Sequence, residues 1–164
     1  MRTRLSPDGR FRLQITPISN GEGYWSYLHV DVFRESDNTL IGKTSRNYSS
    51  DYILQFLKQD GKDYLIISEN YHGGYGVMDL STGEKAIFDP TLTRKDKHEQ
   101  FWCWAGLYGH DADTKQLRIS GCYWAAPYDI ITYDFSNPMQ VPYPILNIED
   151  EPYEDDFDDD ETSN

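Results

Sequence analysis

Residues 51–69 read DYILQFLKQDGKDYLIISE, and this stretch decides the fold. Two runs rich in aromatic and aliphatic residues flank Asp60-Gly61, a dipeptide typical of the two-residue turn between antiparallel strands. A turn at this position sets the facing pairs Leu54 with Ile67, Phe56 with Leu65 and Lys58 with Asp63. These pairs are favourable cross-strand neighbours, so the stretch predicts a β-hairpin over residues 51–59 and 62–69.

The hairpin is the first half of a predicted four-strand unit. It is followed by strands at 75–80 and 85–88, which the turn residues 81–84 separate. The same order is expected on both sides of this unit. Before it we expect strands at residues 11–15, 27–33 and 40–44, and after it at residues 101–110, 116–123, 128–135 and 141–148. The sequence therefore predicts an all-β body, residues 1–148, with three repeats at about 1–47, 48–91 and 98–148.

Acidic residues mark corresponding places in the three repeats. The turn residues Asp8, Asp60 and Asp111 are 52 and 51 residues apart, a period close to that of a propeller blade, which is a four-stranded antiparallel meander of about 40 to 50 residues. Two short motifs carry a resemblance: residues 6–10, SPDGR, resemble the blade hairpin S-P-D-G-[KR], and residues 79–84, DLSTGE, resemble the blade turn D-L-x-T-G-E.

On these motifs, residues 1–148 resemble the β-propeller blade repeats of WD-repeat or TolB type. The resemblance implies three blade-like antiparallel sheets, fewer than the roughly four to eight blades of a closed propeller. Three arrangements therefore follow as alternatives: sandwich-like packing, a small or incomplete propeller, or a homodimer that closes a ring of blades.

Charge is unevenly distributed along the 164 residues, which carry 15 bases and 28 acids for a net charge of −13. Ten of the acids lie in residues 149–164, which leaves a net charge of only −3 on residues 1–148. The last 16 residues are predicted to be a disordered acidic tail, because repulsion between like charges and a shortage of apolar groups oppose folding. No apolar run is long enough to span a bilayer, and we expect a cytoplasmic protein without membrane contact.

The tail supports two interpretations. It is either a solubilising segment or a segment that orders on a basic surface, because aromatic residues are interleaved with its carboxylates. The predicted partner-binding residues of the tail are Glu149, Asp150, Glu151, Tyr153, Glu154, Asp155, Asp156, Phe157, Asp158, Asp159 and Asp160. Direct binding to nucleic acid is disfavoured, because that affinity depends on Lys and Arg at phosphates, and a basic protein partner is expected instead.

The tryptophans are the second set of candidates. They lie at strand ends or beside Gly and Pro, where blades present loops to ligands, and they are Trp25, Trp102, Trp104 and Trp124. Most large aromatic residues pack in cores. A group of them exposed together would form an interface hot spot or a platform on which a sugar stacks.

Residue patterns for catalysis or metal binding are weak. The four histidines share no metal-ligand spacing, and no nucleophile motif is present, so we expect no metal, no cofactor and no catalytic residue. Placing His110 opposite Lys115 sets Cys103 opposite Cys122, for which we favour two buried thiols over a disulfide.

The expected function is that of a non-enzymatic protein–protein interaction module, of inhibitor or immunity type, that binds a basic, nucleic-acid-acting partner through the acidic tail and the aromatic loops. Two alternatives stand beside it: a carbohydrate-binding or glycan-processing β domain, and a scaffold subunit of a larger complex.

Overall fold

The computed structural model describes residues 1–19, 21–48, 54–69, 74–89, 103–122 and 128–150. Regular structure in these ranges consists of strands, and no helix there is long and apolar enough to cross a membrane. The strands are β1 (Arg2–Leu5), β2 (Phe11–Ser19), β3 (Ser26–Arg34), β4 (Thr39–Arg46), β5 (Gln55–Gln59), β6 (Lys62–Ile67), β7 (Tyr75–Asp79), β8 (Lys85–Phe88), β9 (Cys103–Asp111), β10 (Gln116–Cys122), β11 (Asp129–Asp134) and β12 (Ile145–Asp150).

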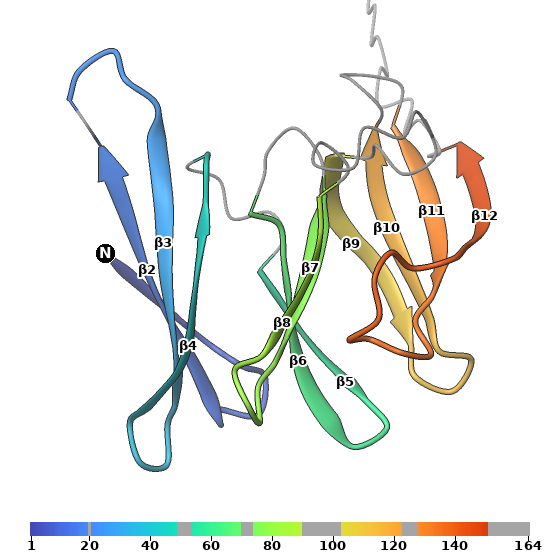
Figure 1. Ribbon diagram of the computed structural model, residues 1–164, viewed down its shortest axis with the longest axis horizontal. Coiled ribbons are helices and arrows are strands. Elements are labelled where there is room, and N and C mark those ends of the chain that lie inside the picture. Colours follow the sequence, from blue (N-terminus) through green and yellow to red (C-terminus); the bar gives the residue numbers. More distant parts are fainter. Residues whose placement is uncertain (20, 49–53, 70–73, 90–102, 123–127, 151–164) are drawn as a thin grey trace, which may run out of the picture.

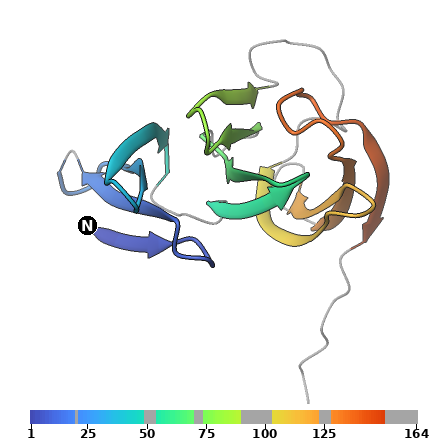
Figure 2. The same cartoon turned by 90° about the horizontal axis from the view of Figure 1, so that it is seen from below.

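The strands form three four-stranded antiparallel sheets, which stand side by side in a row (Figure 1). Each sheet is a meander in which consecutive strands are neighbours: β1 to β4 in sheet 1, β5 to β8 in sheet 2 and β9 to β12 in sheet 3. Figure 2 shows the same row from below, with sheet 2 in the middle. The prediction of an all-β chain with three four-stranded blade-like sheets is confirmed.

The hairpin that decides the fold has the predicted register. Phe56 lies opposite Leu65, and Lys58 lies opposite Asp63. The turn residues Asp60 and Gly61 have φ angles of 50° and 76°. Positive φ at both positions gives a turn whose twist matches that of the flanking strands, which explains why Asp-Gly occupies it.

Sheets 1 and 3 differ from the prediction at their ends. Strand β1 was not predicted, because its four residues Arg2–Leu5 have little apolar character, yet they pair in full with β2. Strand β12 extends through Glu149 and Asp150, two residues into the predicted tail, because both residues continue the ladder with β11. The rest of that segment, 151–164, lies outside the described residues.

Near the turn between β9 and β10, the observed register differs from the predicted one. His110 lies opposite Leu117, not opposite Lys115, yet Cys103 and Cys122 face each other as predicted. Two register shifts along the ladder reconcile these pairings, because they leave Tyr108 and Ala105 without directly facing residues. Cys122 is a buried free thiol, and burial raises its pKa.

Two clusters of buried residues hold the row together. The cluster between sheets 1 and 2 consists of Phe11, Leu13, Ile15, Leu28, Val30, Val32, Leu54, Leu65, Ile67, Met78 and Leu80. The cluster between sheets 2 and 3 consists of Tyr64, Ile66, Tyr75, Val77, Phe88, Trp104, Leu117, Ile119, Ile131, Tyr133, Phe135 and Tyr143. Successive residues of β6 enter different clusters, so sheet 2 is buried on both faces and its run Tyr64–Ile67 is continuously apolar.

Polar contacts also join neighbouring sheets. Between sheets 2 and 3, the Gln59 side chain lies 2.9 Å from His110 Nε2 and donates to the Ala112 carbonyl at 3.3 Å. The nearby turn residue Asp60 accepts a hydrogen bond from Lys115 Nζ at 2.9 Å. Turn residues of one sheet therefore reach the hairpin of the next sheet, which fixes the spacing of the row.

Candidate partner-binding surface

An aromatic cluster lies on sheet 1 around the connection between β2 and β3. Its members are Ile18, Tyr24, Trp25, Tyr27 and Tyr48. Tyr24 is 70% exposed and Trp25 is 62% exposed. The rings of Trp25 and Tyr48 are 5.3 Å apart at an interplanar angle of 59°. Exposed Trp and Tyr side chains held against each other are typical of the anchors of protein interfaces.

Strand alternation explains why this cluster faces outward. Ile15 and Leu28 pack between sheets 1 and 2, so the facing pair Ile18 and Tyr27 lies on the opposite face of sheet 1. The chain turns between these residues through Gly21 and Gly23, whose φ angles of 122° and 82° suit glycine. The loop sequence thus holds Tyr24 and Trp25 at the end of the hairpin.

An acidic strand end forms a second exposed surface, on sheet 3. The last residues of β12, Glu149 and Asp150, are exposed, and the apolar Leu146 and Ile148 of the same strand are 53% and 41% exposed. Glu149 forms an ion pair with Arg118 on β10. The Arg118 guanidinium lies 4.9 Å from the centre of the Tyr108 ring, a cation–π contact.

Both surfaces lie at the same end of the molecule. In Figure 1 the connection between β2 and β3 and the end of β12 lie at the upper end, whereas the turns between β5 and β6 and between β9 and β10 lie at the lower end. Meander topology produces this separation, because every second connection returns to the same end. Sheet 2 lies between the two surfaces, so they occupy opposite flanks of one end.

The position of Trp104 contradicts the prediction that this residue contacts a partner. Its side chain is 1% exposed, and its Nε1 donates to the Tyr133 hydroxyl at 3.1 Å. The ring stacks on Tyr75, with centres 4.2 Å apart. Trp104 is therefore a core residue between sheets 2 and 3, because alternation along β9 directs it toward sheet 2.

Other predicted binding residues fall outside the described ranges: Trp102, Trp124, Glu151, Tyr153, Glu154, Asp155, Asp156, Phe157, Asp158, Asp159 and Asp160. Of the predicted set, the structure therefore places Trp25 in the aromatic cluster and Glu149 and Asp150 on β12. The predicted set did not contain the other members of the cluster, Ile18, Tyr24, Tyr27 and Tyr48. A signal for Tyr27 was present, because Leu28, Val30 and Val32 define the buried face of that strand and leave Tyr27 on the other face.

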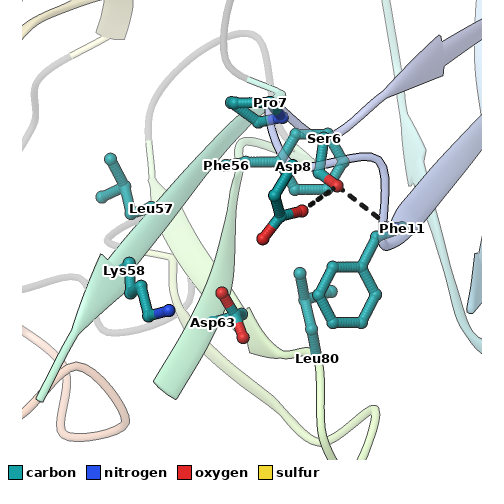
Figure 3. A pocket seen from close by; sticks show the side chains of 9 residues that line it. All are labelled: Ser6, Pro7, Asp8, Phe11, Phe56, Leu57, Lys58, Asp63 and Leu80. Atoms are coloured by element: carbon teal, nitrogen blue, oxygen red, sulfur yellow. Dashed lines mark hydrogen bonds between the residues drawn. The ribbon is translucent and has the colours of Figure 1, made fainter. Parts of the chain in front are cut away.

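A small pocket opens between sheets 1 and 2, with a volume of about 200 Å³ (Figure 3). Its lining residues are Ser6, Pro7, Asp8, Phe11, Phe56, Leu57, Lys58, Asp63 and Leu80. The apolar side chains belong to both sheets, and the polar side chains of Asp8, Lys58 and Asp63 lie beside them. The volume is close to that of cavities that hold a single aromatic ring.

The charged groups around this pocket already bind one another. Arg10 donates to Asp8 and to Asp63, each at 2.6 Å. A hydrogen bond from Ser6 and another from the Arg10 backbone lower the pKa of Asp8 to about 2. Asp8 is therefore ionised at neutral pH and fixes the SPDGR hairpin, which is a structural role. Among the described residues, no group of three or more His, Cys, Asp or Glu side chains is placed to hold a metal ion.

The fold and these surfaces define the class of the chain: an all-β protein of three repeated four-stranded sheets with exposed aromatic and acidic surfaces at one end. It is similar to the uncharacterized protein R762 of Acanthamoeba polyphaga mimivirus, with 30% identity over 162 residues. That alignment covers 96% of this chain, and the chain spans 58% of the relative's length. No family model matches the chain, and no solved structure matches it.

Proposed function

We propose that this protein is a non-enzymatic protein–protein interaction module that binds a basic partner through the aromatic cluster and the acidic end of the chain. The observation that carries the proposal is the exposure of Tyr24, Trp25 and Tyr27, with the Trp25 ring in contact with Tyr48. Exposure of large aromatic side chains to water is unfavourable, and a partner that covers them removes this free-energy cost with little loss of side-chain entropy.

Charge specifies the chemistry of the partner. Glu149 and Asp150 lie at the same end of the molecule as the aromatic cluster (Figure 1). In the sequence they are the first of ten acids in a segment, residues 149–164, that contains no base. Such a segment attracts a basic surface over a distance, and the aromatic cluster supplies short-range contact once the partner has arrived. The carboxylates would occupy Lys and Arg sites that otherwise bind phosphates, so the module would act as an inhibitor or immunity-type protein toward a nucleic-acid-acting partner.

Affinity capture with matched variants tests this proposal. The baits are the full chain, the double variant Trp25→Ser/Tyr27→Thr, a chain that ends at Asp150, and the control Leu40→Ser, which removes an exposed apolar side chain from β4 of sheet 1. We expect the full chain and the control to retain one basic protein from a lysate of native cells. We expect the double variant to lose this protein, and the shortened chain to retain less of it.

Salt provides a second readout, because attraction between exposed charges is screened within about 8 Å at physiological ionic strength. Retention should fall as the salt concentration rises. Equal retention by all four baits, or retention of acidic proteins alone, would contradict the proposal. A shift of tryptophan fluorescence with oligosaccharides that is absent in Trp25→Ser, without capture of a protein, would favour the carbohydrate-binding alternative instead.

A further inference from the structure

Strand β12 leaves one edge of sheet 3 without a neighbouring strand in the described part of the chain. In the order β12-β11-β10-β9 it is the terminal strand, and its ladder partner is β11. Figures 1 and 2 both show it on the outer flank of the row. An edge strand directs backbone N–H and C=O groups away from its sheet, and these groups can pair with another extended chain.

Strand β12 lacks two of the common protections against such pairing, and its bulge lies at one end of the strand. Edge strands are often protected by Lys, Pro or a bulge, and Ile145–Asp150 contains neither Lys nor Pro. The register shift opposite Thr132 and Tyr133 lies near the beginning of the strand, and the ladder is regular from Asn147 to Asp150. Five of the six residues are exposed, including Leu146 and Ile148.

Strands β1 and β8, which are also terminal in their sheets, are better protected. Strand β1 carries Arg2 and Arg4, and Arg4 donates a hydrogen bond to the Leu54 carbonyl beside sheet 2. Strand β8 begins with Lys85, which is 2.7 Å from Glu69. The combination of a regular ladder, exposed apolar side chains and carboxylates is therefore found on β12 and not on β1 or β8.

Charge on β12 selects its occupant. Glu149, which also pairs with Arg118, and Asp150 are adjacent and project to opposite faces of sheet 3, so an added strand meets a carboxylate on both faces. A second copy of β12 would bring its own carboxylates to this edge, and like charges on neighbouring strands are destabilising. A segment with two successive basic residues meets opposite charges instead.

We propose that β12 binds an extended, basic segment of the partner as a fifth strand of sheet 3. The inference rests on the proposed function and names the way in which the partner is recognised. The added strand pairs its backbone with the free edge and places two basic residues beside Glu149 and Asp150. The next residue, which is apolar, lies beside Ile148. Backbone hydrogen bonds provide affinity in this mode of recognition, and the side chains provide specificity.

A synthetic peptide tests the edge directly. The probe is the acetylated peptide Thr-Lys-Arg-Val-Thr-Val, and its matched control replaces Lys-Arg by Glu-Asp. Titration of the full isotope-labelled chain should shift the backbone amide resonances of β12 and slow their hydrogen exchange with the basic peptide. The acidic peptide should leave these resonances unchanged.

Charge-reversal variants distinguish strand addition at β12 from a general attraction of the basic peptide to acidic residues. Glu149→Lys/Asp150→Lys should weaken binding of the basic peptide by roughly tenfold. The control Glu84→Lys/Asp113→Lys makes the same change in net charge at exposed turn positions and should stay within about twofold of the parent chain. Resonances elsewhere report whether either variant alters the fold.

Three results would overturn the inference: equal binding by both variants, equal binding of both peptides, or shifts confined to residues outside sheet 3. Shifts of β12 that depend on protein concentration without peptide would show that a second copy occupies the edge, which would also overturn it. Capture of the same basic protein by the Glu149→Lys/Asp150→Lys chain would refute strand addition and leave the proposed function standing. The proposed function is tested separately, by whether the Trp25→Ser/Tyr27→Thr chain loses the captured protein.

Discussion

Two tryptophans of the same chain have opposite environments. Trp104 is buried, donates to Tyr133 and stacks on Tyr75, whereas Trp25 is largely exposed beside Tyr48. The first stabilises the interior between sheets 2 and 3. The second leaves most of its surface exposed to solvent. The same residue type therefore acts in folding at one position and is available for recognition at the other.

Substitution should separate these two roles. Trp104→Ala should lower the free energy of unfolding by about 3–5 kcal/mol, because it leaves a cavity and an unpartnered Tyr133 hydroxyl. Trp25→Ala should change it by less than about 0.5 kcal/mol. Urea unfolding followed by circular dichroism measures both values. Similar losses in the two variants would contradict the assignment of Trp104 to the core and Trp25 to the surface.

A titratable residue lies at the contact between sheets 2 and 3. Burial lowers the pKa of His110 below its ordinary value of 6.5, and the charge of Asp111 opposes this effect. The unfolded chain therefore takes up the proton at a higher pH than the folded chain. The stability that neutral His110 contributes is present above pH 6.5 and is lost as the pH falls toward the lowered pKa.

This linkage predicts a difference between the protein and His110→Gln. The free energy of unfolding should fall more for the parent chain than for the variant when the pH is lowered from about 7.5 to about 5.5. Glutamine is a suitable replacement because it retains an amide donor for Gln59. Urea titrations at the two pH values measure the difference. Parallel losses would show that His110 does not titrate in this range.

Strands and turns show how far local patterns predict this fold. The hairpin at Asp60-Gly61 could be predicted from the sequence, because Asp-Gly favours the positive φ angles that both turn residues adopt. The register of β9 could not be read in the same way, because its bulges at Ala105 and Tyr108 depend on pairing with β10. The neighbouring Gly106 and Gly109 were the available signal, since glycine within a strand often marks a bulge.

The turn that joins β7 to β8 also sets the distance between sheets 1 and 2. Gly83 has a φ of 78°, and a Cβ atom built on it would lie 2.1 Å from the Ile41 carbonyl oxygen of β4. Gly61 has a φ of 76°, and a Cβ atom there would have no neighbour within 4 Å. The two glycines therefore share a left-handed backbone conformation that is strained for other residues, and they differ in the space around them.

Gly61→Ala should cost about 1 kcal/mol from the backbone conformation alone. Gly83→Ala should cost at least about 2 kcal/mol more, because sheet 1 must also move away from the new methyl group. Thermal unfolding of the two variants provides the comparison. Equal losses would indicate that the turn does not contact sheet 1 as described.

For the whole molecule, the sequence did not predict what the outward faces of sheets 1 and 3 contact. The blade motifs predict a four-stranded sheet, but they do not indicate what covers the outermost face of a row of sheets. On sheet 1, Leu13 faces inward, so Arg12 faces outward, where it pairs with Glu35 and lies 4.5 Å from the Phe33 ring. On sheet 3, Arg118 pairs with Glu149. A ring closed by two copies would have to bury these charged groups, which is costly.

We therefore expect the mass of one chain in light scattering, including at high protein concentration. Exposed ion pairs are compatible with water on these faces, and burying them offers little gain. A mass of two chains would show instead that the copies close a larger ring, as the count of three blade-like sheets allows.

Hydrogen exchange of the complex between the full chain and its captured basic partner tests whether recognition takes place at one end of the molecule. We expect slower exchange over residues 18–27 and in β12 (Ile145–Asp150), with no change at the turns Asp60-Gly61 and Asp111–Lys115 at the opposite end. Slower exchange at those turns, with the aromatic cluster and β12 unchanged, would contradict this expectation.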